Sequence, residues 1–258
     1  MKARDALRDA ERRLAAAGVD TPRVDAEWLV AHALGTTRSG VQARLDDEVE
    51  LDGLLTRREQ REPLAYVLGE WGFRRLTLKT DRRALVPRPE TEIVVERSLA
   101  LLEHMTTPRV LDIGVGSGAI ALAIKDERPD AIVVGVDVAD DALALARENA
   151  VRLRLDVELR QDDETAAADG WDLVVSNPPY VDSLAGLQPE LQYEPKVALL
   201  GEGFHERIAR TAQTRALVFE VGDGQAGEIA ETLRAAGYRD VRITADLAGL
   251  DRVVEGVR

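Results

Sequence analysis

The chain has 258 residues, of which 45% are hydrophobic, so it is long enough for one large α/β domain and a small second one. It contains no cysteine, which excludes disulfides, a thiolate nucleophile and thiolate metal sites. Its net charge of -13 gives an overall field that repels phosphate, which counts against a DNA- or RNA-modifying enzyme.

The first residues alternate charges and lack an apolar signal core, and no apolar run approaches the ~20 residues that cross a bilayer. We therefore expect a cytoplasmic protein that makes no membrane contact. The histidines, His32, His104 and His205, are far apart and lack metal-ligand spacing, so no metal site is expected.

Residues 1–68 are predicted to form a small helical bundle. Apolar residues recur at helical spacing over residues 3–17, 25–34 and 51–61, and glycines follow the first two segments. The bundle carries no recognisable chemistry, so we assign it a substrate-docking role. Residues 69–89 alternate in polarity near their centre and predict a short hairpin that acts as a hinge.

From residue 90 to residue 258, short apolar runs alternate with helical patterns. Such alternation indicates a mostly parallel sheet that is covered on both faces. A last apolar run follows the sixth after only a short loop that leaves no room for a crossover helix, so these two strands should be antiparallel. The strands are predicted at residues 109–113, 132–136, 157–159, 173–175, 216–221, 241–244 and 252–255, with helices at 117–127, 139–152 and 224–236.

The first of these strands ends in a glycine-rich turn, Gly114-Val115-Gly116-Ser117-Gly118, and a helix follows it. Glycine allows unusual backbone angles and close approach of a ligand, and the free N–H groups of a helix N-terminus favour an anion. Asp137 ends the next strand, where its carboxylate can accept hydrogen bonds from both hydroxyls of a ribose. Asp163, just after the third strand, either reaches an adenine amino group or lies in solvent.

The glycine turn does not decide which nucleoside binds. Gly114, Gly116 and Ala119 also satisfy the loose pattern of a nicotinamide-cofactor site. A dinucleotide oxidoreductase is therefore an alternative at this point, although it leaves the second motif of the chain unexplained.

That motif is Asn177-Pro178-Pro179-Tyr180, which follows a predicted strand. The prolines have a fixed φ and no N–H, so the loop is stiff and cannot continue the strand ladder. The Asn177 amide offers a donor and an acceptor, the Pro178 carbonyl has no ladder partner, and Tyr180 offers a flat face. Together they can clamp a planar group that carries an NH2, such as an amide or an exocyclic amine. The alternative is an ordinary proline turn.

The glycine turn and Asn-Pro-Pro-Tyr together resemble the class I S-adenosylmethionine-dependent methyltransferases that act on amide or amine nitrogen. Residues 85–92, Leu-Val-Pro-Arg-Pro-Glu-Thr-Glu, are similar to a motif of the glutamine-N5 methyltransferases of peptide chain release factors. Residues 61–69 and 246–252 look like two further segments of that family. The resemblance covers nearly the whole chain.

The resemblance implies an α/β, Rossmann-like fold with a seven-stranded, mostly parallel sheet and an antiparallel last strand. It implies methyl transfer from S-adenosylmethionine to the glutamine of the Gly-Gly-Gln tripeptide in class 1 release factors. Two alternative substrates are a glutamine of a ribosomal protein and the N6 atom of adenine in nucleic acid. Pro-Glu-Thr-Glu favours the release-factor branch. The expected partner is therefore a protein, and we expect a monomer without stable binding of nucleic acid.

The resemblance also implies residue roles in the cofactor site. Gly114, Val115, Gly116, Ser117 and Gly118 would hold the methionine part of the cofactor, and Asp137 its ribose. Asp163 and Glu164 would lie near the adenine, but Glu164 stands where family members often carry a bulky residue, so this contact stays open.

In the substrate site, Asn177 Oδ1, close to the cofactor, and the Pro178 carbonyl would each accept one N–H of the glutamine amide. Pro179 and Tyr180 would bound the slot, with Asn177, Pro178 and Tyr180 as the catalytic group. Arg88 and Glu90 either wall the entrance or simply begin a helix. Residues 181–204 are expected to border the slot, and Glu220 is interpreted as structural.

Overall fold

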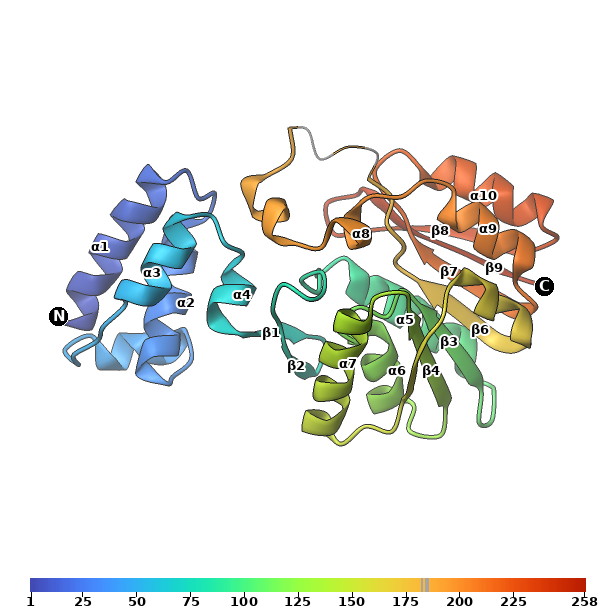
Figure 1. Ribbon diagram of the computed structural model, residues 1–258, viewed down its shortest axis with the longest axis horizontal. Helices are drawn as coiled ribbons and strands as arrows, with labels where there is room; N and C mark the ends of the chain where they lie inside the picture. Colours follow the sequence, from blue (N-terminus) through green and yellow to red (C-terminus); the bar gives the residue numbers. More distant parts are fainter. Residues whose placement is uncertain (182, 184–185) are drawn as a thin grey trace. The chain divides into compact units, whose positions relative to one another are not determined.

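A computed structural model describes residues 1–181, 183 and 186–258 (Figure 1). These residues form two compact units, one of residues 1–70 with 187–193 and one of residues 71–186 with 194–258. The segment 187–193 lies far along the chain and nevertheless packs with the N-terminal helices. Part of the loop at 181–204 therefore belongs to the first unit, and its residues 182, 184 and 185 lie outside the described residues.

The first unit is helical, which confirms the helices predicted in residues 1–68. Leu14 of the first helix and Leu29 of the second are fully buried in its core. The second helix begins at a proline, whose fixed φ suits the first helical turn, and ends at Gly35 with a left-handed φ of 60°. The elements are α1 (Ala3–Ala16), α2 (Pro22–Leu34), η1 (Ser39–Arg44), α3 (Asp52–Glu59), α4 (Leu64–Leu68) and η3 (Pro189–Tyr193).

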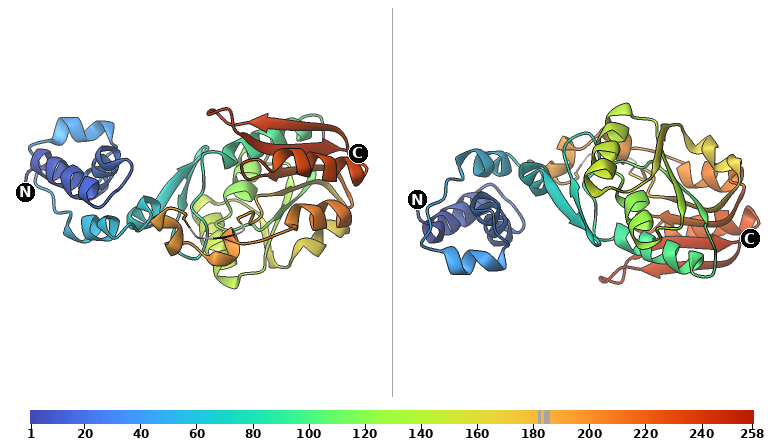
Figure 2. Two further views of the ribbon diagram at one scale, coloured as in Figure 1. Left: turned by 90° about the horizontal axis from the view of Figure 1, so that it is seen from above. Right: turned by 90° about the horizontal axis from the view of Figure 1, so that it is seen from below.

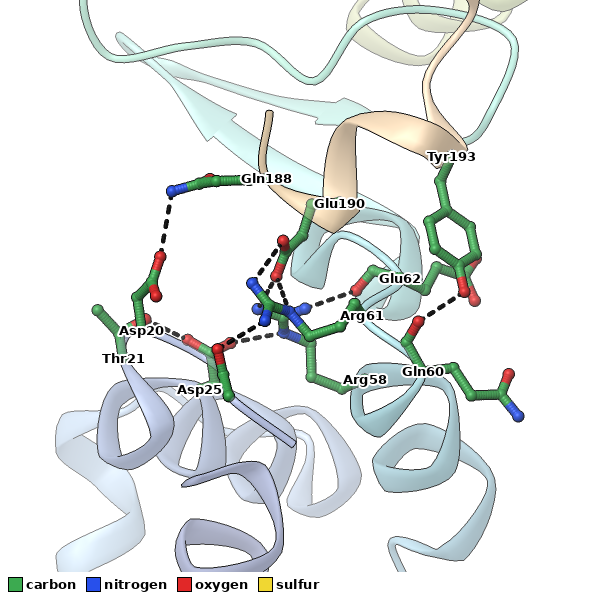
Figure 3. Close-up of polar contacts among 11 residues, drawn as sticks. Asp20, Thr21, Asp25, Arg58, Gln60, Arg61, Glu62, Gln188, Glu190 and Tyr193 are labelled. Atoms are coloured by element: carbon green, nitrogen blue, oxygen red, sulfur yellow. Dashed lines mark hydrogen bonds and ion pairs between the residues drawn. The ribbon is translucent and has the colours of Figure 1, made fainter. Parts of the chain in front are cut away.

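A cluster of charged side chains ties the segment 187–193 to these helices (Figure 3). Arg58 is buried and donates from Nε to Asp25 Oδ2 at 2.7 Å and from Nη2 to Glu190 Oε1 at 2.9 Å. Arg61 donates to both carboxylate oxygens of Glu190, at 2.6 and 2.7 Å. Two further hydrogen bonds attach the segment, from Tyr193 Oη to Gln60 O at 2.7 Å and from Gln188 Nε2 to Asp20 Oδ2 at 3.1 Å.

In the described residues, the second unit has a seven-stranded sheet of order β5-β4-β3-β6-β7-β9-β8. The neighbours from β5 to β7 are parallel, and β9 is antiparallel to both β7 and β8. This arrangement confirms the predicted fold class. The strands are β3 (Arg109–Ile113), β4 (Ile132–Asp137), β5 (Glu158–Gln161), β6 (Trp171–Ser176), β7 (Thr214–Glu220), β8 (Arg239–Ala245) and β9 (Asp251–Val257).

Helices cover both faces of this sheet (Figure 1 and Figure 2). Alternate residues of β6 point to opposite faces, with Leu173 and Val175 in one apolar core and Val174 in the other. One core is completed by α5 (Thr91–Leu102), α6 (Ala119–Glu127) and α7 (Asp140–Leu153), and the other by η2 (Glu164–Asp169), α9 (Phe204–Thr211) and α10 (Ala226–Ala235).

A two-stranded hairpin precedes the sheet, as predicted for residues 69–89. Its strands are β1 (Glu70–Phe73) and β2 (Leu76–Lys79), and Phe73 and Leu78 are buried in the apolar core that also contains residues of α5, α6 and α7. Among the described residues, no helix combines the length and the apolar composition needed to span a bilayer.

The strand order places two loops side by side. Strand β3 has β4 on one side and β6 on the other, so the chain continues from β3 toward one edge of the sheet and from β6 toward the opposite edge. Ligands of open α/β sheets bind at such a switch point, beyond the carboxyl ends of the strands. Ile113 pairs with Ser176, so the glycine turn after β3 and Asn177 after β6 meet at this edge.

Candidate functional site

A cavity of about 410 Å3 opens at this edge of the second unit, a size common for small-molecule sites. Most of the residues predicted for the site line it. They are Arg88, Gly114, Val115, Gly116, Ser117, Asp137, Asp163, Glu164, Asn177, Pro178 and Pro179. Within the described part of the chain, Gly118, Glu90 and Tyr180 are not among the lining residues.

The glycine turn is shaped by positive φ angles of 74° at Gly114, 54° at Gly116 and 89° at Gly118. A Cβ on Gly114 would meet no protein atom within 4 Å, so this glycine leaves room on the cavity side. A Cβ on Gly118 would instead stand 2.8 Å from Leu122 Cδ1. Gly114 thus serves close approach of a ligand, whereas Gly118 lets α6 pack beside the turn.

Asp137 holds the glycine turn in place. Its Oδ2 accepts the Gly116 N–H at 3.0 Å, and its Oδ1 accepts the Ala139 N–H at 2.9 Å. Each oxygen of a carboxylate has a further lone pair, so Asp137 can accept two more hydrogen bonds from the hydroxyls of a ribose. The turn and this carboxylate together could hold a nucleoside cofactor.

Another part of the cavity lining brings together residues from η2 and α9. Arg207 Nε donates to Glu164 Oε1 at 2.6 Å, and its guanidinium carbon lies 4.2 Å from the ring centroid of Phe204. Asp163 is engaged locally, since its Oδ1 accepts from the N–H and the hydroxyl of Thr165 at 2.9 and 2.6 Å. Phe204 ends the segment 181–204 that was expected to border the slot, whereas sequence reasoning missed Arg207, because one basic residue on an amphipathic helix matches no motif.

The Asn177 side chain is part of a chain of hydrogen bonds behind the cavity. Its Nδ2 donates to Thr91 Oγ1 at 3.3 Å, and the Thr91 hydroxyl donates to Glu220 Oε2 at 2.6 Å. Tyr180 Oη donates to Glu220 Oε1 at 3.4 Å. Burial raises the pKa of Glu220 to about 7 and that of Tyr180 to about 12.

Arg88 lines the cavity as one partner of an ion pair. Its Nη2 donates to Glu194 Oε1 at 2.5 Å, and Glu194 Oε2 accepts the Val86 N–H at 3.0 Å. Glu194 is buried, and its neighbour Pro195 also lines the cavity. The pair therefore joins two segments of the cavity wall. Glu90 directly precedes α5, the position of the helix-start interpretation.

Asp112 lies inside β3, 1% exposed, below the glycine turn. Its Oδ2 accepts the Ala121 N–H at 3.0 Å, whereas its Oδ1 finds no partner among the residues that the structure describes. Burial raises the pKa of Asp112 to about 7, with a smaller contribution from Asp137. The folded state therefore holds a proton that the unfolded chain gives up near pH 4.

This proton makes Asp112 a source of pH dependence. Its stabilising contribution is full below about pH 4 and is lost as the pH rises to about 7. Asp112→Asn removes the titrating group, so the variant lacks this loss of stability. The free energy of unfolding of the variant minus that of the natural chain should therefore increase with pH, by at most ~1.4 kcal/mol per pH unit. Urea denaturation at pH values between 4 and 7.5 measures this difference, and a flat difference would contradict the assignment.

Two family profiles match the chain. Residues 5–69 match the profile described as "PrmC N-terminal domain", and residues 94–192 match "Methyltransferase small domain". Solved structures share the fold: the catalytic domain of human METTL16 in complex with the MAT2A 3′UTR hairpin 1 superposes with a TM-score of 0.61 at 17% identity, covering 83% of this chain and 84% of that one.

Curated relatives match over nearly the full length. The release factor glutamine methyltransferase of Caulobacter vibrioides is 39% identical over 96% of this chain and 94% of its own length. The proteins of that name in Deinococcus radiodurans and Escherichia coli are 38% and 37% identical over 100% and 97% of this chain, and over 99% and 96% of their own lengths. With both family profiles in place and identities of this size over whole chains, the chain belongs to the family of release factor glutamine methyltransferases.

Proposed function

We propose that this chain transfers a methyl group from S-adenosylmethionine to the side-chain amide nitrogen, N5, of the glutamine in the Gly-Gly-Gln tripeptide of class 1 peptide chain release factors. The observation that carries the proposal is the position of Asn177 on the cavity wall, beside the glycine turn, with Nδ2 donating to Thr91. Its Oδ1 accepts no hydrogen bond from the described residues and is left for an incoming N–H. The proposal also takes the enzyme to be a cytoplasmic monomer.

The cavity fits the cofactor on two counts. Gly114 leaves space where any other residue would project a side chain, and Asp137 retains acceptor capacity after fixing the turn. Bound S-adenosylmethionine would supply a methyl group from its sulfonium; the products would be the thioether and a glutamine whose nitrogen carries that methyl group in place of one proton. The residues from Gly114 to Ser117 would hold the methionine part, and Asp137 the ribose.

The protein's task is then to position a poor nucleophile, since the lone pair of an amide nitrogen is delocalised. Asn177 Oδ1 and the Pro178 carbonyl would each accept one N–H of the glutamine, which fixes the nitrogen and stabilises the positive charge that develops on it. Pro179 lines the cavity and bounds the slot, and Tyr180 supports it from behind through Glu220. With its pKa raised to about 12, the Tyr180 phenol stays protonated at neutral pH and cannot take up the proton, which would go to water.

Asp137→Asn tests the cofactor site. An asparagine at this position would turn an NH2 toward the N–H of Gly116 or of Ala139 and would offer one acceptor fewer to the ribose. Because hydrogen bonds to charged groups contribute ~1.5–3 kcal/mol, the Kd for S-adenosylmethionine should increase about 10- to 100-fold. Isothermal titration calorimetry measures it.

Asp140→Asn is the matched control for this experiment. Asp140 is the exposed first residue of α7, does not line the cavity, and loses the same charge. Its Kd is expected to stay within about threefold of the natural value. If Asp137→Asn behaves like this control, Asp137 does not hold the ribose.

We also propose that the helical first unit docks the release factor. The described residues that line the cavity all belong to the second unit, so the surface of the first unit is available to bind a protein. Crosslinking of enzyme to release factor, mapped by mass spectrometry, tests this role. Crosslinks that spare residues 1–70 would exclude it.

The substrate class is tested by offering labelled S-adenosylmethionine and three acceptors: a class 1 release factor, ribosomal large-subunit proteins and DNA. Label on the release factor alone supports the proposal. Label on a ribosomal protein or on DNA, with none on the release factor, would replace it by one of the alternative substrates. The net charge of -13 supports a protein acceptor, because phosphate is repelled.

A further inference from the structure

We propose that Thr91, held by Glu220, is a positioning residue that orients the Asn177 amide so that its oxygen faces the cavity. This inference rests on the proposed function and assigns roles to two residues outside Asn177-Pro178-Pro179-Tyr180, one of which, Thr91, belongs to the segment 85–92. Thr91 is 4% exposed and lines the cavity, and Glu220 is 2% exposed and is not among the described lining residues.

The fold brings these three residues together from distant parts of the chain. Strands β6 and β7 are parallel, and Ser176 pairs with Phe219, so the residues that follow them, Asn177 and Glu220, lie at the same edge of the sheet. Thr91 is the first residue of α5, which packs against β6 and β7.

Helix α5 is fixed in this position by an ion pair further along its length. Arg97 donates from Nε and Nη2 to the two carboxylate oxygens of Glu255 in β9, both at 2.7 Å. Glu255 is buried, and two parallel hydrogen bonds of this kind define one geometry. Thr91 is therefore presented to the sheet edge by an anchored helix.

The direction of each hydrogen bond follows from the number of hydrogens available. A threonine hydroxyl has one hydrogen, and at 2.6 Å from Glu220 Oε2 that hydrogen is committed to the carboxylate while Glu220 is ionised, above its pKa of about 7. Thr91 Oγ1 can then only accept from Asn177, so the Asn177 NH2 must face Thr91. If the amide were flipped, Asn177 Oδ1 and Thr91 Oγ1 would face each other with lone pairs only.

The consequence for the reaction is direct. With the NH2 held by Thr91, Asn177 Oδ1 is the atom left for the substrate amide, whose nitrogen carries only donors. In the flipped state a substrate N–H would meet the Asn177 NH2, and no hydrogen bond could form between these two groups. Glu220 thus acts on the substrate through Thr91 and Asn177, without touching it.

Thr91→Val keeps the shape of the side chain and removes the hydroxyl, whereas Thr91→Ser keeps the hydroxyl. We expect Thr91→Val to lower kcat about tenfold or more, which corresponds to ~1.4 kcal/mol, while KM for the release factor changes less. Glu220→Met, similar in size but without the acceptor, should lower kcat to the same extent. Thr91→Ser should restore kcat to within about threefold of the natural enzyme.

Thr214→Val is the matched control. Thr214 is also a buried threonine of the second unit, and its hydroxyl donates to Ala216 O at 3.0 Å, with no link to Asn177. It is expected to leave kcat unchanged. In an Asn177→Ala background, Thr91→Val should cause no further loss, because the group that it orients is gone.

Two results would overturn the inference: a kcat for Thr91→Val equal to that of Thr214→Val, or an undiminished loss in the Asn177→Ala background. Failure of the proposed function is distinguishable, because the natural enzyme would then not methylate the release factor at all.

In that case nitrogen-15 NMR of the free enzyme tests whether Thr91 orients the Asn177 amide. The side-chain NH2 signal of Asn177, identified by its absence in Asn177→Ala, should shift in Thr91→Val and stay in place in Thr214→Val. An unmoved signal in Thr91→Val contradicts the inference.

Discussion

Replacing Asn177 by alanine is expected to lower kcat for release factor methylation about 100- to 1,000-fold. The variant loses the acceptor that orients the glutamine nitrogen and stabilises its developing charge, and removal of one preorganised group of this kind typically costs that much. The fold should survive, because Asn177 follows β6 and, among the residues that the structure describes, its side chain makes one hydrogen bond, of 3.3 Å. Single-turnover kinetics with saturating cofactor measure the effect.

Gln161→Ala is a suitable control for this variant. It also removes an amide near the carboxyl edge of the sheet, but Gln161 is exposed and is not among the described lining residues, and its Nε2 donates to Val138 O at 3.0 Å. Its kcat should stay within about threefold of the natural value. A loss of less than tenfold for Asn177→Ala, which is ~1.4 kcal/mol, would remove Asn177 from the central role.

Arg58→Ala is expected to destabilise the first unit by about 3–5 kcal/mol. The side chain of Arg58 is 7% exposed and bridges Asp25, itself 5% exposed, and Glu190. Its removal leaves Asp25 as a buried carboxylate without its cation, and breaking a buried pair from one side carries a cost of this size. Glu190 keeps its two hydrogen bonds from Arg61, so the loss of Arg58 costs it less free energy than it costs Asp25.

Hydrogen exchange followed by mass spectrometry measures this effect segment by segment. The amides of α1, α2 and α3 and of residues 189–193 should exchange faster in Arg58→Ala, while those of the sheet of the second unit keep their rates. Arg23→Ala removes an ion pair with Glu27 whose arginine is 58% exposed, and should change little. Equal exchange in both variants would show that the buried cluster does not stabilise the first unit.

The fold was predictable because its signals are periodic or local. Short apolar runs between helical patterns indicate a parallel sheet, and the short turn at Gly249 leaves no room for a crossover before β9. Asp137 and Asn177 were predictable as site residues for the same reason. Asp137 ends one strand and Asn177 directly follows another, and parallel strands bring their carboxyl ends to one edge.

The contacts that orient the site were not predictable. Thr91 reads as part of a helix start and Glu220 as the end of a strand, and their meeting with Asn177 depends on the packing of α5 across the sheet edge. Likewise, charged residues such as Arg58, Arg61 and Glu190 usually indicate a solvent-exposed surface. Nothing in the pattern of residues 187–193 indicates that they pack with helices more than a hundred residues earlier, because ion pairs, unlike helices and strands, leave no periodic pattern in the sequence.

The most direct test of the central claim is a mass-resolved methylation assay. Purified enzyme and S-adenosylmethionine are mixed with a class 1 release factor, and in parallel with the same factor carrying Gln→Ala in its Gly-Gly-Gln tripeptide. We predict a gain of one methyl group, ~14 Da, on the first and none on the second, since only the glutamine amide presents the two N–H groups that Asn177 and Pro178 would accept. An equal gain on both factors, or none on either while the cofactor binds, would contradict the account.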